Sequence, residues 1–344
     1  MKFGSDPRAD FLGEPATAAL SPEDEHRRQR LPADIALAAN RLASHVRQTP
    51  LEWSPWLSEV TGANVWLKLE NQQLTGSFKL RGAFNKLLNL SDEDRARGCV
   101  TASSGNHGAA VAWAMRELGV DGLIFVPEHT SAAKVDAIRR AGAALQFFGT
   151  DGLDTESHAR EYAAEHGLCF VSPYNDWDVI AGQGSCGVEI ARQLPDVDAV
   201  FVAVGGGGLV SGVGSFLKSA RPGVRIVSAQ PEASAVMTES ARAGRILELT
   251  SERTLSDGTA GGIEADAITF PLCQAVVDRY VTVGEEAIAE AMRDFIDAQH
   301  QLIEGAAGVA VAALLKSAAD YREQNVVVVV CGGNVSLDTL RSIL

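Results

Sequence analysis

Helical stretches alternate with short apolar strands through the middle of the sequence, and this alternation restricts the fold more than any other feature. The pattern predicts two helices and two strands in the order helix 107–118, strand 122–126, helix 131–141 and strand 145–148. Gly119 and Gly142 follow the two helices, where glycine readily adopts the left-handed conformation that ends a helix. Such an alternation is typical of an α/β fold with parallel strands covered by helices on both faces.

More strands are expected before and after this region. The apolar pattern predicts them over residues 64–70, 199–204, 225–229 and 326–330. We therefore expect two open, mostly parallel twisted sheets flanked by helices. Ligands in such sheets gather at the carboxyl ends of the strands, so the segments that follow them are the first places to look for chemistry.

Charge and composition exclude several kinds of partner. The formal net charge of −14 disfavours nucleic acid and anionic membrane surfaces, and no apolar run is long enough to span a bilayer. The five cysteines are widely spaced and form no CxxC pair, which argues against a disulfide framework and against a thiolate zinc site. We expect a cytoplasmic protein.

The amino-terminal stretch 1–32 is polar, contains prolines and lacks the apolar segment of a signal peptide. We interpret it as a flexible extension. A helix is expected over 35–42, and the pair Thr49-Pro50 would stop it, because the residue before a proline disfavours the helical conformation.

Four consecutive glycines, Gly205 to Gly208, lie between a predicted strand and a predicted helix. Their N–H groups could bind a phosphate at the helix start, where the helix dipole also favours negative charge. Glycines after a strand can also serve only a tight turn, but four in a row favour the phosphate site. The spacing does not fit a dinucleotide site, since no G-x-G-x-x-G is present and Gln230 ends the next strand where a carboxylate would be needed.

A second cluster of small polar residues, 101–108, follows another predicted strand and begins a helix. Its N–H groups could bind a carboxylate. A simple helix cap would account for the same residues, because Ser and Asn are common N-caps. His107 by itself suggests a structural side chain rather than a catalytic one.

Six segments together resemble the fold-type II pyridoxal-phosphate enzymes, and within them the threonine/serine dehydratase and serine racemase branch. The segments are TGSFKLRGA (75–83), SSGNHG (103–108), AGQG (181–184), GGGG (205–208), IEGAAG (303–308) and CGGN (331–334). The resemblance covers residues 35–340, and the order of the segments also agrees.

The resemblance implies a cofactor, pyridoxal 5'-phosphate, and a role for each of several residues. Lys79 would link covalently to the cofactor's aldehyde, Phe78 would pack beside its ring, Asn106 would bind the ring hydroxyl, and Glu304 and Cys331 would also contact the cofactor. The phosphate would be held by Gly205, Gly206, Gly207, Gly208 and Leu209, and the substrate carboxylate by Ser103, Ser104, Gly105, Asn106 and His107. We expect the loop around Asp257 to line the pocket for the substrate side chain.

The same resemblance implies two domains with the cofactor in the cleft between them. The large domain would comprise 33–97 and 176–344, and the small, mobile domain 98–175. A homodimer is typical of the family.

Physical chemistry supports the central roles. A lysine in a partly desolvated pocket near positive potential loses its proton more readily and becomes a nucleophile toward an aldehyde. Cys331 matches the family position beside the pyridine nitrogen, where a neutral group makes the ring a weaker electron sink and favours prompt loss of a β-substituent. Cys331 could also be only a small buried residue.

We therefore predict an ammonia-lyase in which Lys79 removes the α-proton of a β-hydroxy amino acid such as L-threonine or L-serine. A racemase, with Ser104 acting on the opposite face, fits the same residues. Less common substrates such as hydroxyaspartate, phenylserine or a hydroxyectoine-derived amino acid also remain open, as does a non-catalytic cofactor-binding protein. Gln230 and Val236 stand where metal-dependent relatives carry carboxylates, so we predict no divalent activator.

Overall fold

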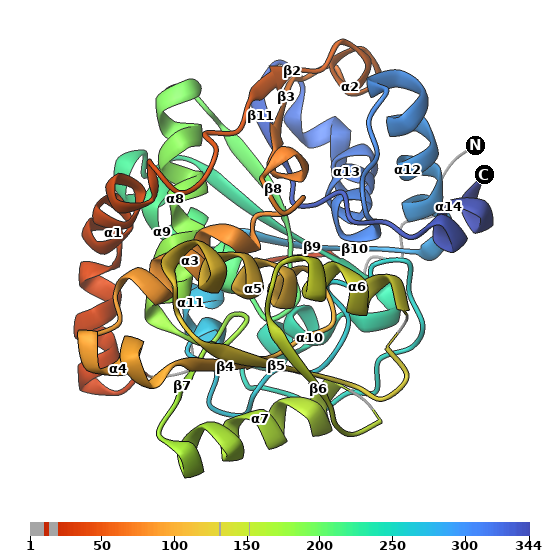
Figure 1. Ribbon diagram of the computed structural model, residues 1–344. Helices are drawn as coiled ribbons and strands as arrows, with labels where there is room; N and C mark the ends of the chain where they lie inside the picture. The colour runs from red at the N-terminus through yellow and green to blue at the C-terminus, as the bar shows by residue number, and fades with distance from the viewer. Residues whose placement is uncertain (1–9, 14–19, 131, 151) are drawn as a thin grey trace.

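The computed structural model describes residues 10–13, 20–130, 132–150 and 152–344 and contains two sheets. One sheet has seven strands and the other has four, and Figure 1 shows the smaller sheet below the larger one. The expected α/β architecture with two open, mostly parallel sheets is confirmed.

The larger sheet has the strand order β1-β10-β9-β8-β11-β3-β2. Its five central strands are parallel, and β1 and β2 pair antiparallel at the two edges. The strands are β1 (Phe11–Leu12), β2 (Leu51–Trp53), β3 (Asn64–Leu69), β8 (Ala199–Ala203), β9 (Arg225–Pro231), β10 (Arg279–Val283) and β11 (Asn325–Val330).

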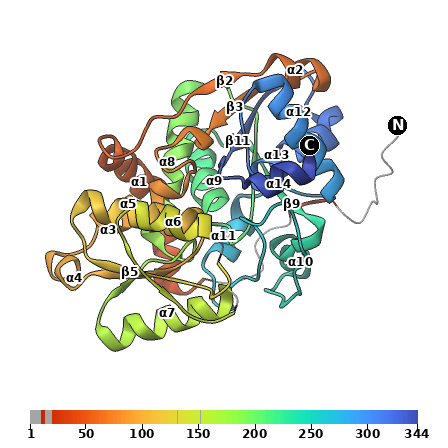
Figure 2. The ribbon, with the colours of Figure 1, turned by 45° about the vertical axis from the view of Figure 1, so that its right-hand side comes forward.

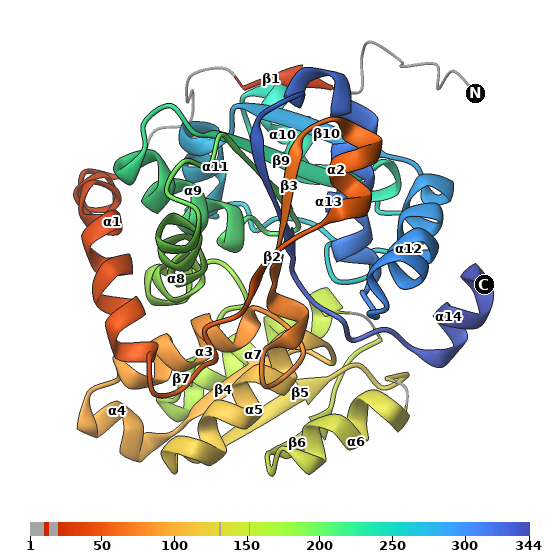
Figure 3. The same ribbon diagram turned by 90° about the horizontal axis from the view of Figure 1, so that it is seen from above.

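Helices cover both faces of this sheet, as Figure 3 shows from above. On one side lie α1 (Pro22–Leu42), α8 (Trp177–Gln193), α9 (Gly208–Ala220) and α11 (Thr269–Val276). On the other lie α2 (Pro55–Thr61), α12 (Glu285–Gln299), α13 (Gly305–Ser317) and α14 (Leu337–Ile343). The remaining elements near this sheet are α10 (Val236–Ala243) and the short 3-10 helices η1 (Glu70–Gln72), η2 (Glu232–Ser234) and η3 (Ala318–Tyr321).

The smaller sheet is wholly parallel, with the strand order β6-β5-β4-β7. Its strands are β4 (Cys99–Ala102), β5 (Gly122–Val126), β6 (Ala144–Phe147) and β7 (Cys169–Phe170). In Figures 1 and 2 the helices α5 (Asn106–Leu118) and α6 (Ala132–Arg140) lie on the face toward the larger sheet, and α7 (Gly152–His166) lies on the opposite face. Helix α3 (Lys79–Leu88) packs against both α5 and α8, and α4 (Asp92–Arg97) follows it.

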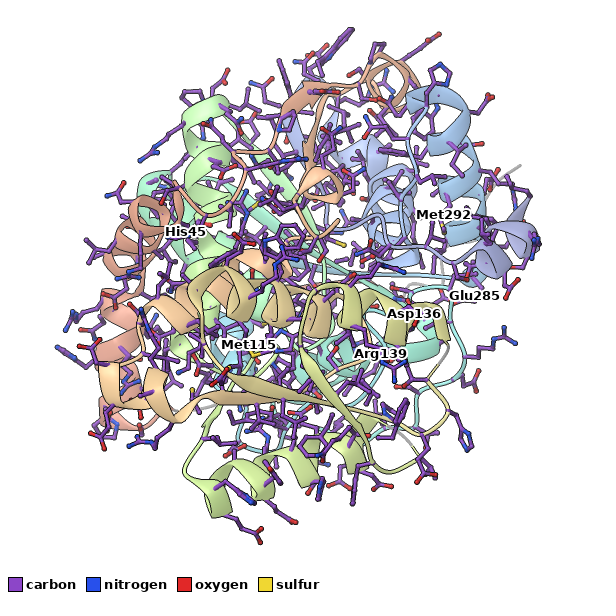
Figure 4. All side chains as sticks on the ribbon, viewed as in Figure 1. His45, Met115, Asp136, Arg139, Glu285 and Met292 are labelled. Carbon is purple, nitrogen blue, oxygen red and sulfur yellow. The ribbon has the colours of Figure 1, made fainter. Side chains whose placement is uncertain are left out.

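Each sheet has its own hydrophobic core. The core of the larger sheet includes the β11 valines and Met292 of α12, and the core of the smaller sheet includes Ile124 and Met115 of α5. Figure 4 shows Met292 and Met115 in different halves of the molecule. Leu80 and Phe84 of α3 belong to the second core, so the helix that begins with Lys79 is anchored to the smaller sheet as well as to α8.

The amino-terminal region differs from the expectation. Helix α1 begins at Pro22, and residues 22–32 are therefore helical rather than a flexible extension. The Ser21 side chain accepts a hydrogen bond from the N–H of Asp24, and Arg28 pairs with Glu25 one turn away. These are a helix cap and an i,i+3 ion pair, so the charged composition that suggested a solvated tail instead supports a helix. Residues 1–9 and 14–19 lie outside the described residues.

The other predicted elements agree with the structure to within a few residues. Strand β9 is longer than expected, since it runs to Pro231. Helix α1 ends at Leu42, before the Thr49-Pro50 pair that was expected to stop it. The first residue of the helix predicted over 131–141 lies outside the described residues. In the part of the chain that the structure describes, no helix is long and apolar enough to cross a membrane.

Candidate active site

Lys79 is the first residue of α3, and the loop before it is tied to the end of β11. The N–H of Phe78 donates to the carbonyl of Cys331 at 3.0 Å, and the N–H of Gly333 donates to the carbonyl of Gly76 at 2.9 Å. Ser77 and Gly332 form an isolated antiparallel bridge between these bonds. The segments 75–83 and 331–334 are far apart in the sequence, and this ladder makes them neighbours.

The Lys79 residue is only partly exposed, and its amine donates a hydrogen bond of 2.7 Å to the carbonyl of Pro173. Burial lowers the pKa of Lys79 to about 8, while the neighbouring Cys331, Glu156 and Glu304 act in the opposite direction. The expected desolvation of Lys79 is therefore present. Nearby positive charge, which was also expected, is not among the causes that lower the pKa of Lys79. A lysine with this pKa is neutral often enough near neutral pH to act as a nucleophile or a base.

The four glycines lie between β8 and α9 in a space that admits no side chain. A Cβ on Gly206 would collide with the Tyr174 ring, and a Cβ on Gly205 would lie 3.0 Å from the Cα of Thr259. Gly207 has a φ of 88°, a conformation that L residues rarely adopt. The first turn of α9, which includes Leu209, leaves N–H groups without helical partners, so this loop can bind an anion such as a phosphate.

The segment 103–108 follows β4 and begins α5, as the sequence predicted. The Ser103 hydroxyl accepts a hydrogen bond from the N–H of Gly105 at 3.2 Å. That bond makes the segment a compact turn, and the next N–H groups, at the start of the helix, remain available for an anion. Ser104 is part of this turn and is partly exposed.

Asn106 contacts residues from the other sheet. Its Nδ2 donates to both carboxylate oxygens of Glu304 at 2.9 Å, and its Oδ1 accepts a bond of 2.7 Å from Nδ2 of Asn334. The Asn334 side chain also donates to the carbonyl of Thr75. The amide of Asn106 is thereby held in one orientation. Burial raises the pKa of Glu304 to about 7, against the lowering effect of its hydrogen bond from Asn106.

His107 is buried, and its Nε2 lies 2.9 Å from the carbonyl of Val171. Burial, together with the charge of Lys79, lowers the pKa of His107 to about 3, so the ring is neutral. This setting agrees with the structural interpretation of its side chain. Its backbone N–H still belongs to the first turn of α5.

Cys331 follows β11 and is buried next to the loop that carries Lys79. Burial raises the pKa of its thiol well above the usual value, so the side chain is neutral at physiological pH. A neutral group at this position is what the sequence predicted.

Asp257 is the predicted site residue that lies farthest from the interior. Its carboxylate is 71% exposed and pairs with Lys134 of α6 at 3.2 Å. The neighbouring Gly258 would place a Cβ 3.7 Å from Oε1 of Glu304, so this loop does border the site. A contact between Asp257 and a substrate stays a prediction.

The structure adds residues that the sequence did not identify. Tyr174 packs against two of the four glycines, Pro173 accepts the bond from Lys79, and Glu156 of α7 lies near enough to influence the Lys79 charge. Nothing in their sequence context marks them. Asn334 was recognised only as part of a motif, although an asparagine after two glycines at a strand end could have suggested a polar contact.

These residues fit the cofactor that the sequence analysis implied. The partly buried amine of Lys79, the glycine loop before α9 and the start of α5 follow the carboxyl ends of strands from both sheets. The fold and the site together define an α/β protein that combines a lysine of lowered pKa with a glycine loop suited to an anion.

Comparisons with known proteins agree with this arrangement. The family model described as "Pyridoxal-phosphate dependent enzyme" matches residues 42–332. L-threonine ammonia-lyase of Thermotoga maritima is 41% identical over 311 residues, which are 90% of this chain and 77% of that protein. The processed form of threonine deaminase isoform 2 from Solanum lycopersicum has a TM-score of 0.87 and 34% identity, with 97% of this chain and 95% of that chain covered. Maize serine racemase has a TM-score of 0.86 and 32% identity, with 90% and 95% covered.

The chain therefore belongs to the family of pyridoxal-phosphate-dependent enzymes, and the resemblance seen in the sequence is confirmed.

The lowered pKa of Lys79 predicts how fast the cofactor-free protein takes up pyridoxal 5'-phosphate at different pH values. Only the neutral amine attacks an aldehyde, so the uptake rate should rise as the pH increases through about 8 and then level off. An ordinary lysine, with a pKa of about 10.4, would give a rate that still climbs well above that pH. Stopped-flow absorbance across a pH series measures the rate, and continued increase to about pH 10 would contradict the assignment.

The glycine loop generates a second prediction. Gly206→Ala places a methyl group against the Tyr174 ring, and overpacking of this kind costs about 1–3 kcal/mol, or about 5- to 150-fold in affinity. We expect the dissociation constant for pyridoxal 5'-phosphate to rise within that range. Gly223→Ala is the matched control, because a Cβ at Gly223 meets nothing within 4 Å. Equal affinity in both variants would show that the loop does not hold the cofactor.

Proposed function

We propose that this protein is a lyase that eliminates water from a small β-hydroxy amino acid, such as L-threonine or L-serine. A water molecule then hydrolyses the resulting imine, so the net products are a 2-oxo acid and ammonia. The observation that carries the proposal is the partly buried amine of Lys79, with its lowered pKa. It bonds to the carbonyl of Pro173, and the next residue, Tyr174, packs against the glycine loop. The 41% identity to a protein named L-threonine ammonia-lyase supports this choice of reaction.

Lys79 is the residue to which we assign covalent attachment of the cofactor and removal of the α-proton. When bound, pyridoxal 5'-phosphate supplies an aldehyde that condenses with amino groups and a ring that withdraws electrons from the substrate's Cα. With a pKa of about 8, the amine can release and take up a proton near neutral pH, as a general base must. Phe78 flanks it, with its ring centroid 5.3 Å from the Lys79 Nζ.

The first turn of α5 is the proposed site for the substrate carboxylate. The residues concerned are Ser103, Ser104, Gly105, Asn106 and His107. The N–H groups of Ser103 and Gly105 already donate to the Phe125 carbonyl and to the Ser103 hydroxyl, so those of Ser104, Asn106 and His107 are the donors that we assign to the anion. Asn106 has a second proposed role, which is contact with the ring hydroxyl of the cofactor. Its Nδ2 donates to both carboxylate oxygens of Glu304 and its Oδ1 accepts from Asn334, so the ring hydroxyl would take the place of one of the Glu304 bonds.

Cys331 is the residue by which we distinguish elimination from transamination. A neutral thiol provides no charge to keep a pyridine nitrogen protonated, so negative charge at Cα is stabilised less strongly. Under that condition a hydroxyl group on Cβ leaves promptly. The Cys331 side chain thus favours loss of water over the slower reactions that need a long-lived carbanion.

We propose that the smaller sheet and its helices, residues 98–175, close over the substrate as one unit against 33–97 and 176–344. Three contacts support this division, because each joins the two units beside the site. They are Asn106 with Glu304, Lys134 with Asp257 at 3.2 Å, and Arg160 with Glu264 at 2.8 Å.

A cytoplasmic homodimer is part of the proposal. The five cysteines are all free thiols, which suits a reducing compartment. Size-exclusion chromatography with light scattering measures the assembly, and a monomer at physiological concentration would contradict it.

Independence from divalent cations remains a prediction. The Gln230 Oε1 accepts two hydrogen bonds of 2.7 Å from Thr238, and no group of three His, Cys, Asp or Glu side chains suited to a metal occurs in the described part of the chain. We expect activity to be unchanged after treatment with EDTA. Loss of activity that magnesium restores would overturn this expectation.

The central test is Lys79→Ala. We expect the visible absorbance of lysine-bound cofactor to disappear and turnover to fall by at least about 10²- to 10⁴-fold, the usual contribution of a positioned base. Lys218→Ala at the far end of α9 is the control, since Lys218 pairs with Asp278 away from the site. Retained turnover in Lys79→Ala would refute the assignment.

The same assay distinguishes the lyase from a racemase, which the similarity to maize serine racemase keeps as an alternative. With pure L-serine we expect pyruvate and ammonia as the main products. In the alternative, Ser104 would return a proton to the opposite face of Cα. D-serine without pyruvate would establish that reaction instead.

A further inference from the structure

In the proposed site, the aldehyde and the phosphate of pyridoxal 5'-phosphate would be held at the starts of two different helices. Lys79 begins α3, whereas the glycine loop begins α9. These helices are joined through α8, which packs against both. The spacing between the lysine and the loop therefore depends on how closely α8 approaches each neighbour.

The backbones of α3 and α8 come into direct contact at Gly182. A Cβ on Gly182 would lie 2.5 Å from the carbonyl of Arg81 and 2.7 Å from the Cα of Gly82. A Cβ on Gly82 would in turn collide with Gln183, whose Oε1 accepts a bond of 3.2 Å from the N–H of Gly82. Two glycines thus face each other at the crossing point, within one turn of Lys79.

The contact between α8 and α9 is built in the same way. A Cβ on Gly212 would lie 2.6 Å from the backbone nitrogen of Gly184 and would also collide with the carbonyl of Ile180. A Cβ on Gly187 would lie 3.1 Å from the Cα of Val213. The segment AGQG at 181–184 therefore supplies close contacts to both neighbouring helices.

A buried charge network sets the rotation of α3 against α8. The Arg81 guanidinium is fully buried and binds both oxygens of Glu70 and both oxygens of Glu189, at 2.7 to 3.0 Å. Its Nη1 also donates to Ser185 at 3.1 Å, and Lys68 pairs with Glu189. The network joins β3, η1 and α3 to α8.

The role of this charge network is better explained by the orientation that it imposes on α3 and α8 than by a contribution to the free energy of folding. Buried ion pairs lose in desolvation much of what they gain in attraction, and apolar residues of similar size often stabilise a fold as well. A two-pronged guanidinium with a fixed direction to each carboxylate, however, permits only one arrangement of the helices that carry them. The arrangement it fixes is the one that places Lys79.

We propose that α8 is a spacer that sets the position of Lys79 relative to the phosphate loop, with Gly182, Gly187 and Arg81 as positioning residues. Arg81 is linked to the site only through its backbone, since its N–H donates to the carbonyl of Phe78 at 3.0 Å while its side chain binds Glu70 and Glu189. The inference rests on the proposed roles of Lys79 and the glycine loop. If α8 has this role, the cofactor can bind through its aldehyde and its phosphate at once only when the distance between Lys79 and the glycine loop matches the length of the cofactor.

The test compares the whole cofactor with its two parts. In the wild type, pyridoxal 5'-phosphate should bind far more tightly than pyridoxal or inorganic phosphate, because the second contact forms within an already bound molecule. In Gly182→Ala we expect the affinity for pyridoxal 5'-phosphate to fall by about tenfold or more, since a shift of an ångström in a positioned group has large effects. The affinities for pyridoxal and for inorganic phosphate, measured by absorbance titration and calorimetry, should each stay within about twofold.

Gly122→Ala in β5 is the matched control. A Cβ on Gly122 would lie 2.5 Å from the carbonyl of Cys99, which is the same steric load against a backbone oxygen as at Gly182, but in the smaller sheet. This control should melt at a lower temperature yet retain the wild-type advantage of the whole cofactor over its parts. An equal loss of that advantage in the control would overturn the proposal.

Gly187→Ala covers the case in which Gly182→Ala does not fold. Its Cβ needs only a few tenths of an ångström of movement, so the protein should remain folded by circular dichroism, and the affinity for pyridoxal 5'-phosphate should fall by about threefold with the parts unchanged. Unchanged affinity in folded Gly187→Ala, or parallel losses for the cofactor and its parts, would overturn the spacer role. Absence of lysine-bound cofactor in the wild type would instead refute the proposed function itself.

Discussion

The structure depends on the close approach of three helix backbones. The backbone of α8 touches those of α3 and α9 at two points, because glycines, Gly182 and Gly212, occupy these crossing points. One outer helix begins with Lys79 and the other begins at the glycine loop. A cofactor held at both ends tolerates little error in that spacing, and packed backbones are harder to displace than interleaved side chains.

Burial determines the protonation state of the titratable side chains near the start of α3. It lowers the pKa of Lys79 to about 8 and that of His107 to about 3, and it raises the pKa of the Cys331 thiol. One physical cause therefore yields a reactive amine, an inert imidazole and a neutral thiol. Charged forms are disfavoured in a poorly solvated pocket, so each group takes the form that carries no charge more readily than in water.

The two sheets contribute different parts of the site. The larger sheet supplies the segments before Lys79, after β8 and after β11, while the smaller sheet supplies the start of α5. Asn106 joins the two through Glu304 and Asn334. These hydrogen bonds form only at one separation of the two sheets. A change in that separation would therefore also change the orientation of the Asn106 amide.

The sequence by itself determined the elements and the local motifs. Glycines after strands and the βα alternation predicted the fold and the loop, because turn conformation and hydrophobic periodicity are local properties. The role predicted for Lys79 came from the resemblance of the TGSFKLRGA segment to a known family. The sequence did not identify Tyr174, Glu156 or the α8 crossings, and it mistook the capped start of α1 for a flexible tail. Contacts such as that of Gly182 with Arg81 join residues about a hundred positions apart, and a pKa such as that of Lys79 depends on everything packed around the amine. Only the tertiary structure decides these, because distance and desolvation arise when distant segments of the chain meet.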